Sequence, residues 1–182
     1  MGWVASHPEA LPDESGRAAP GTTITDVHLS ILGGDADRAY LGLPEDAVHM
    51  RFAAIRAHYV VVQFFNCLCA DCLRELAQMD ALREALELKD VSGEDGVPLL
   101  RFIGIAVHDE ARRVAAFRRK QKTGFPLFVD RSGALLEGLG ITAPPAACLL
   151  EKTEQGVIVR ALAAGSDRER DTFVQMVRSL AE

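Results

Sequence analysis

The chain has 182 residues, 48% hydrophobic and 25% charged, and its 20 Lys and Arg residues against 26 Asp and Glu residues give a formal net charge of −6. This composition is typical of one soluble globular domain, and the acidic balance argues against a nucleic-acid partner. A domain of this length buries about 70% of its unfolded surface and needs no disulfide or metal for stability, so its four cysteines call for a chemical explanation.

The sequence predicts no membrane span. Its longest uncharged apolar stretch, Tyr59–Phe65, is far shorter than the ~20 residues that a spanning helix needs. Residues 1–9 contain neither the basic nor the apolar region of an export signal. Two compartments stay open: the cytoplasm, or the periplasm or another extracytoplasmic space if a signal peptide has been removed.

Residues 1–22 are predicted to be a flexible N-terminal lead-in, and residues 23–182 one folded domain. The lead-in places prolines and glycines among small and acidic residues without apolar periodicity. Short β-prone pieces follow in residues 22–32, and the Gly33–Asp35 segment predicts a turn. Residues 50–55 predict a short helix or a turn.

The strongest pattern lies in the middle of the chain. Tyr59–Phe65 is β-branched and aromatic without alternation, which predicts a strand that is covered on both faces. Residues 71–88 have apolar residues at helical spacing with charges between them, which predicts an amphipathic helix. Residues 99–107 predict a second buried strand, and Asp109 is expected to cap a helix that ends near Lys122.

The rest of the chain predicts five shorter elements: a strand at residues 125–130, a short helix at 134–139, a hairpin of strands at 146–150 and 157–162, and a last helix at 167–180. Helix-length connections between buried strands imply parallel pairing, and the final hairpin adds an antiparallel edge. The predicted fold class is therefore three-layer α/β.

Two of the cysteines, Cys69 and Cys72, stand between the first buried strand and its helix. The N–H groups and the dipole at a helix N-terminus stabilise an anion, so Cys69 is the candidate nucleophile. Cys72 lies one helical turn away and is the candidate resolving thiol. Half of a zinc site or two buried thiols would show the same spacing, but the βαβ context favours redox chemistry.

The segment from Phe64 to Glu75 resembles the active-site segment of the thioredoxin-like superfamily. It is most similar to the TlpA-like or ResA-like thiol-disulfide oxidoreductases of the redoxin branch, whose Cys-x-x-Cys is followed three residues later by an acid. Residues 124–133 and 140–150 also resemble that branch, and the likeness covers about residues 55–180. The resemblance implies a central mixed sheet with helices on both faces and a C-terminal β-hairpin plus helix.

Pro145 matches the cis-proline of this family. An X-Pro bond adopts the cis form at low cost, and proline has no N–H to donate. In the family the residue before this proline presents backbone groups to the substrate. Here that residue is Pro144, which offers only a carbonyl. Pro144 and Pro145 are thus the candidate substrate-binding residues, and a purely rigid turn is the alternative.

Three positions depart from the family pattern or bear on proton transfer. Leu68 replaces the aromatic residue that usually precedes the nucleophile, and Gln63 stands where thioredoxins place a buried acid. Gln63 cannot accept the proton of Cys72, so another base or water is needed. Glu75 is an acid three residues after Cys72 on the same helix, and we expect it to be an ordinary solvent-facing helix charge.

Cys67 and Cys148 are not explained by the Cys-x-x-Cys pair. We expect Cys148 to be a core residue and Cys67 a buried thiol at a strand end. In a thioredoxin-like fold their neighbourhoods are expected to face each other across adjacent strands. A cluster of all four cysteines that binds zinc or another soft metal therefore stays open as an alternative.

The predicted function is thiol-disulfide exchange between the Cys69 and Cys72 pair and protein or peptide disulfides, with a redox partner protein and without cofactor or metal. A thiol peroxidase is one alternative, since peroxiredoxins share the fold, but their Pro-x-x-x-Thr/Ser-x-x-Cys signature is absent. A non-catalytic metal-binding or carrier module is the other. The resemblance also implies work outside the cytoplasm on exported proteins.

Overall fold

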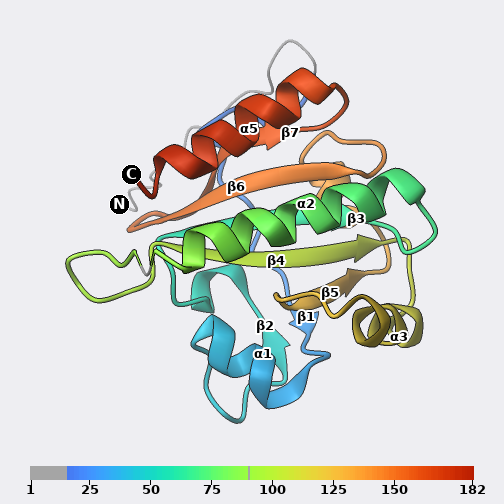
Figure 1. Cartoon of the computed structure of the whole chain (residues 1–182), viewed down its shortest axis with the longest axis horizontal. Coiled ribbons are helices and arrows are strands. Elements are labelled where there is room, and N and C mark those ends of the chain that lie inside the picture. The colour runs from blue at the N-terminus through green and yellow to red at the C-terminus, as the bar shows by residue number, and fades with distance from the viewer. Residues whose placement is uncertain (1–15, 90) are drawn as a thin grey trace, which may run out of the picture.

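The β-branched and aromatic stretch of the sequence forms β3 (Tyr59–Phe65), the central strand of a five-stranded sheet (Figure 1). The computed structural model describes residues 16–89 and 91–182. The strands stand in the order β5-β4-β3-β6-β7. The other four strands are β4 (Leu100–Val107), β5 (Leu127–Asp130), β6 (Ala146–Thr153) and β7 (Gly156–Ala163).

The sheet is mixed, as predicted. β4 pairs in parallel with β3 and β5 in parallel with β4, because a helix connects each strand to the next. β6 is antiparallel to both β3 and β7, so the C-terminal hairpin forms the other side of the sheet. The three-layer α/β class with a thioredoxin-like arrangement is confirmed.

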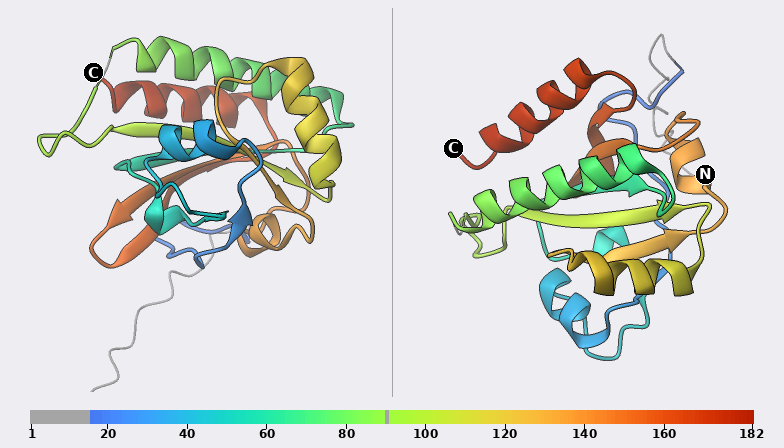
Figure 2. Two further views of the ribbon diagram at one scale, coloured as in Figure 1. Left: turned by 90° about the horizontal axis from the view of Figure 1, so that it is seen from below. Right: turned by 45° about the vertical axis from the view of Figure 1, so that its right-hand side comes forward.

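Helices cover both faces of this sheet (Figure 2). They are α1 (Gly34–Leu41), α2 (Ala70–Glu87), α3 (Ala111–Gln121), α4 (Ala134–Gly138), α5 (Asp167–Ser179) and the short 3₁₀ helix η1 (Phe52–Ala54). Apolar side chains of α2, α3 and α5 share one core cluster, and those of α4 and η1 share the other. Within the described residues, no helix is both long and apolar enough to cross a bilayer.

Alternation along β3 explains how one strand serves two cores. Val60, Val62 and Phe64 belong to the cluster under α4, whereas Val61 and Phe65 belong to the cluster under α2. Successive side chains of a strand point to opposite faces, so Gln63 shares the α2 side with Val61 and Phe65. This register places a buried amide beneath the helix that carries the cysteine pair.

The turn predicted at Gly33–Asp35 is wrong, because α1 begins there. Gly33 is the N-cap residue, and Gly42 ends the helix with a positive φ of 66°. The buried Asp37 forms an ion pair with Arg118 of α3, with 2.7 Å from Nη1 to Oδ2. A contact far apart in sequence therefore stabilises a short helix that its local composition does not indicate. Short strands flank it, β1 (Leu29–Ser30) and β2 (His49–Met50).

The chain segment before β1 runs along the outer edge of β7. The N–H of Gly21 donates to the carbonyl of Val159 at 2.7 Å, and Val159 donates to Thr22 at 2.8 Å. Ile24 donates to Val157 at 3.0 Å. Residues 1–15 of the predicted lead-in lie outside the described residues. The start of the folded domain at residue 23 stays a prediction.

Candidate functional site

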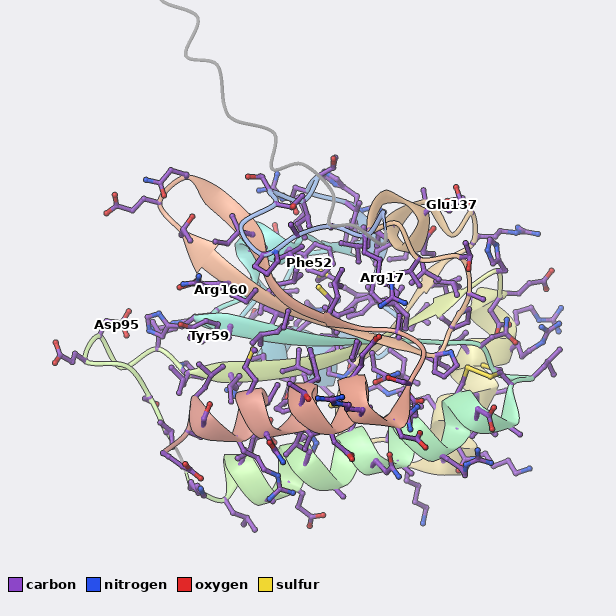
Figure 3. All side chains as sticks on the ribbon, turned by 90° about the horizontal axis from the view of Figure 1, so that it is seen from above. Arg17, Phe52, Tyr59, Asp95, Glu137 and Arg160 are labelled. Carbon is purple, nitrogen blue, oxygen red and sulfur yellow. A yellow bond between two sulfur atoms is a disulfide. The ribbon has the colours of Figure 1, made fainter. Side chains whose placement is uncertain are left out.

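The cysteine pair lies in the connection between β3 and α2. Asn66 shapes this loop: its Oδ1 accepts the N–H of Leu68 at 3.0 Å, and its Nδ2 donates to the carbonyl of Val107 at 3.0 Å. Since Val107 ends β4, the loop is attached to the neighbouring strand. Cys69 and Cys72 are joined by a disulfide bond, with 5.2 Å between their Cα atoms (Figure 3).

The two sulfur atoms differ in access. Cys69 is the N-cap residue of α2 and is half-buried, and its Sγ accepts the N–H of Cys72 at 3.1 Å. Cys72 is fully buried in the core cluster beneath the helix. An incoming thiol or disulfide therefore meets the sulfur of Cys69 first. The roles of nucleophile for Cys69 and resolving thiol for Cys72 stay a prediction.

Pro144 and Pro145 are joined by a cis peptide bond. β6 starts directly after them, and its Ala146 stands opposite Phe64 of β3, so the prolines lie beside the end of the central strand. They line a cavity of about 350 Å³ together with residues of the first turns of α2 and the start of α5. The other lining residues are Asp71, Arg74, Glu75, Gln78, Ala143, Gly165, Asp167 and Arg170.

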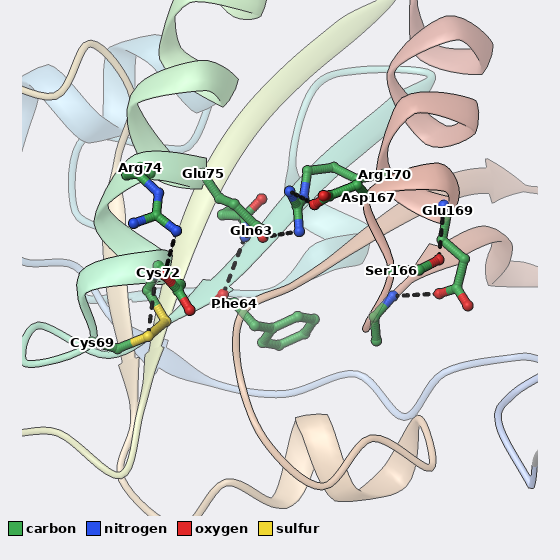
Figure 4. A network of polar contacts seen from close by, with 12 residues as sticks. Gln63, Phe64, Cys69, Cys72, Arg74, Glu75, Ser166, Asp167, Glu169 and Arg170 are labelled. Carbon is green, nitrogen blue, oxygen red and sulfur yellow. Dashed lines mark hydrogen bonds and ion pairs between the residues drawn. A yellow bond between two sulfur atoms is a disulfide. The ribbon is translucent and has the colours of Figure 1, made fainter.

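Glu75 does not face solvent, so the expectation of an ordinary surface charge is wrong. Its residue surface is only 8% exposed, because this side of α2 packs onto the sheet. Oε1 of Glu75 accepts from Arg170 of α5 at 2.6 Å, and Oε2 accepts from Nε2 of Gln63 at 3.4 Å (Figure 4). Burial raises the pKa of Glu75 above its ordinary value, and Arg170 opposes that rise.

Gln63 completes this polar group in the core. Its Nε2 also donates to the carbonyl of Phe64 at 3.2 Å, and among the described residues its Oε1 has no hydrogen-bond partner. Gln63 stands where thioredoxins place a buried acid, and its amide does not titrate. Glu75 has a raised pKa and lies three residues from Cys72 on the same helix, which makes it a candidate for proton exchange with the resolving thiol.

The four cysteines do not form one cluster. Cys148 is fully buried on β6 opposite Val62, in the core cluster on the other face of the sheet from Cys72. The expectation that Cys148 is a core residue is confirmed, and the expected proximity of Cys67 and Cys148 is wrong because the strand register turns Cys148 away. Across the described residues, no group of three or more His, Cys, Asp or Glu side chains is arranged to hold a metal.

Cys67 is half-buried and contacts Asp109, a residue whose role the sequence did not reveal. The expectation that Asp109 caps the next helix is wrong, since Glu110 is the N-cap residue of α3. The carboxylate of Asp109 instead accepts the backbone N–H of Cys67 at 2.9 Å. An acid between a buried strand and a helix is compatible both with capping the helix and with binding the backbone of a neighbouring loop. The sequence could not distinguish these two roles.

The sequence matches the model of the AhpC/TSA family over residues 42–174. The chain belongs to the AhpC/TSA family. No curated protein has a sequence that significantly matches it.

Solved structures support the same fold. A Chlorobium tepidum protein assigned as thiol:disulfide interchange protein DsbE is 12% identical, with a TM-score of 0.65 over 90% of this chain and 99% of that chain. A thioredoxin-family thiol:disulfide interchange protein of Chlorobium tepidum TLS is 18% identical, with a TM-score of 0.58; the match covers 90% of this chain and 99% of that chain. StoA of Bacillus subtilis is 14% identical, with a TM-score of 0.57; the match covers 87% of this chain and 97% of that chain.

The family match and the fold together confirm the resemblance to the redoxin branch of the thioredoxin-like superfamily. The protein is an oxidoreductase of the redoxin type with a Cys-x-x-Cys pair at the junction of β3 and α2. At these low identities the solved structures establish the fold alone.

Proposed function

We propose that this protein is a thiol-disulfide oxidoreductase that exchanges the Cys69 and Cys72 dithiol or disulfide with disulfides or dithiols of protein or peptide substrates. The observation that carries the proposal is the asymmetric pair itself. A half-buried N-cap cysteine is disulfide-bonded to a fully buried cysteine, and Asp71, which stands between them, lines a cavity that the cis-proline bond also borders.

In the reducing direction, the thiolate of Cys69 attacks one sulfur of a substrate disulfide. A mixed disulfide forms, and the first substrate sulfur leaves as a thiolate. The thiolate of Cys72 then attacks Sγ of Cys69, which forms the intramolecular disulfide and releases the second substrate thiolate. Two electrons pass from the protein to the substrate, and a redox partner protein must restore the dithiol. The oxidising direction reverses each step.

Residues around the pair have defined tasks in this scheme. The first turn of α2 presents free N–H groups that stabilise the sulfur anion of Cys69. Glu75 is suited to accept the proton of Cys72, since burial raises its pKa toward neutrality. Pro144 and Pro145 border the cavity and offer carbonyl oxygens but no N–H, so an extended substrate would pair here through its own donors.

The absence of the peroxiredoxin signature at these two cysteines supports disulfide exchange over the reduction of peroxides. Counting back three and seven residues from Cys69 gives Asn66 and Val62, and from Cys72 it gives Cys69 and Phe65. Neither cysteine is therefore preceded by the threonine or serine and the proline of the peroxiredoxin signature. Rapid consumption of hydrogen peroxide by the reduced protein would favour the peroxidase instead.

Single serine substitutions test the proposal. Cys69→Ser is expected to abolish turnover in an insulin-reduction assay, because Cys72, the other thiol of the pair, is fully buried and cannot start exchange. Cys72→Ser is expected to accumulate a mixed disulfide with the substrate, which mass spectrometry detects as an adduct on Cys69. Cys148→Ser serves as the control and should keep its turnover, because this thiol lies in the opposite core. Turnover that survives Cys69→Ser contradicts the proposal.

A further inference from the structure

Asp109 is a buried carboxylate that joins the cysteine loop to the start of α3. The residue is 2% exposed and stands two positions after Val107, the last residue of β4. Its Oδ1 accepts the N–H of Glu110 at 2.9 Å and Nη1 of Arg113 at 3.1 Å. Its Oδ2 accepts the backbone N–H of Cys67 at 2.9 Å, so the carboxylate lies next to this half-buried cysteine.

The position of Cys67 creates a competing reaction. It is half-buried and lies two residues before Cys69, so it is the nearest other cysteine to Cys69 along the chain. A thiolate at Cys67 that attacked Sγ of Cys69 would form a disulfide between these two residues and expel the substrate thiolate. That product has the same oxidation state as the Cys69 and Cys72 disulfide, but it leaves the buried Cys72 as an unused thiol.

We propose that Asp109 is a positioning residue whose buried carboxylate keeps Cys67 in its neutral thiol form and thereby reserves Cys69 for exchange with Cys72. A thiolate at Cys67 would place a second negative charge beside this buried carboxylate, which disfavours ionisation of the thiol. The inference rests on the proposed function for the roles of Cys69 and Cys72.

The charges around Cys67 agree with this arrangement. Burial and the hydrogen bond to Asp109 raise the pKa of Cys67 to about 12, with Arg113 opposing. The charged groups that act on this thiol are Asp109, in the connection after β4, and Arg113, on the first turn of α3. Arg113 is itself paired with Asp109, with 3.1 Å from Nη1 to Oδ1.

The first test measures the alkylation of Cys67 by iodoacetamide between pH 7 and pH 10. A Cys69→Ser/Cys72→Ser background leaves only Cys67 and the fully buried Cys148, so the result does not depend on turnover. With Asp109 intact, the rate at pH 8 should be less than one tenth of that measured for the same thiol in urea, where the pKa is close to that of a free thiol. A folded protein in which Cys67 titrates like a free thiol overturns the inference.

The variant Asp109→Asn keeps a hydrogen-bond acceptor but removes the charge. It should shift the alkylation profile of Cys67 to lower pH and raise the rate at pH 8 about tenfold or more, since one pKa unit is a tenfold change in thiolate. Glu110→Gln, which neutralises the adjacent acid without touching Cys67, should leave the profile in place. A uniform increase at every pH would show loosening of the loop alone and would contradict the inference.

The second test uses the protein with all four cysteines. After oxidation by glutathione disulfide, fragmentation mass spectrometry should find only the Cys69 and Cys72 bond in the parent protein. Asp109→Asn should add a fraction with the Cys67 and Cys69 bond, and Cys67→Ser/Asp109→Asn should lose it. An Asp109→Asn protein that forms only the Cys69 and Cys72 bond contradicts the inference. A parent protein without that bond contradicts the proposed function instead.

Discussion

Glu75 and Cys72 lie three residues apart on α2, which puts their side chains on one face of the helix. Both are buried, and the carboxylate is shared between Arg170 and Gln63. The ion pair compensates part of the cost of burying the charge, but burial still raises the pKa of Glu75. A carboxyl group in this state can gain and lose a proton closer to neutral pH than a surface glutamate can.

Glu75→Gln tests this role through the pH dependence of exchange. Ionised Glu75 accepts the proton of Cys72, so the rate of intramolecular disulfide formation should rise as the pH increases through the raised pKa. In Glu75→Gln this rising part should disappear, and the rate at pH 7 should fall by about tenfold to a hundredfold. Quenched-flow mass analysis of the mixed disulfide can follow the step.

Glu84→Gln is the matched control, because Glu84 lies on the exposed side of the same helix. Its profile should coincide with that of the parent protein. A Glu75→Gln profile with the same shape and midpoint as the parent would show that water or another group accepts the proton.

At the scale of elements, α5 links the core to the site. Phe173 and Val177 are buried against the sheet face that also carries α2. The same helix directs Arg170 to Glu75 and places Asp167 at the cavity beside the prolines. The packing of a helix far along the chain thus determines the polar surroundings of the resolving cysteine.

Phe173→Ala should lower the free energy of unfolding by about 3–5 kcal/mol, because it removes a large side chain that is 2% exposed. Met176→Ala, on the outer side of α5 with 40% of the residue exposed, should change it by less than about 1 kcal/mol. Urea unfolding followed by circular dichroism measures both. Equal losses in the two variants would contradict the packing of α5 described above.

The topology of the whole molecule assembles the site at one edge of the sheet. β3 and β4 are parallel, so the cysteine loop and Asp109 follow their carboxyl ends at the same edge. β6 is antiparallel to β3, so its first residues, with the prolines before them, meet that edge as well. At the far side of the hairpin, the segment from Gly21 to Ile24 is hydrogen-bonded to β7.

Truncation measures what this N-terminal segment contributes. Removal of residues 1–24 should lower the free energy of unfolding by about 2 kcal/mol or more relative to removal of residues 1–15, because three backbone hydrogen bonds to β7 and the contacts of Ile24 are lost. Urea unfolding of the two shortened chains makes the comparison. Equal stability of the two would place the start of the folded domain after residue 24.

The sequence by itself determined the order of strands and helices from residue 59 onward and the place of Cys69 and Cys72 between β3 and α2. These features depend on hydrophobic periodicity and helix-end chemistry, which act between residues close together in the chain. The sequence around Pro145 is likewise a local pattern, so the proline before the start of β6 could be matched to the cis-proline of the family. The same dependence on local patterns explains the error at α1, whose short helix relies on the contact of Asp37 with Arg118.

Only the tertiary structure decided how the remaining polar groups and cysteines are used. The register of β3 turns Gln63 toward α2, the packing of α5 gives Glu75 its arginine, and the pairing of β3 with β6 directs Cys148 to the opposite core. The parallel pairing of β3 and β4 brings Asp109 to Cys67. Each of these contacts joins segments that are distant in sequence, so its energy depends on strand register and helix packing, which no local pattern contains.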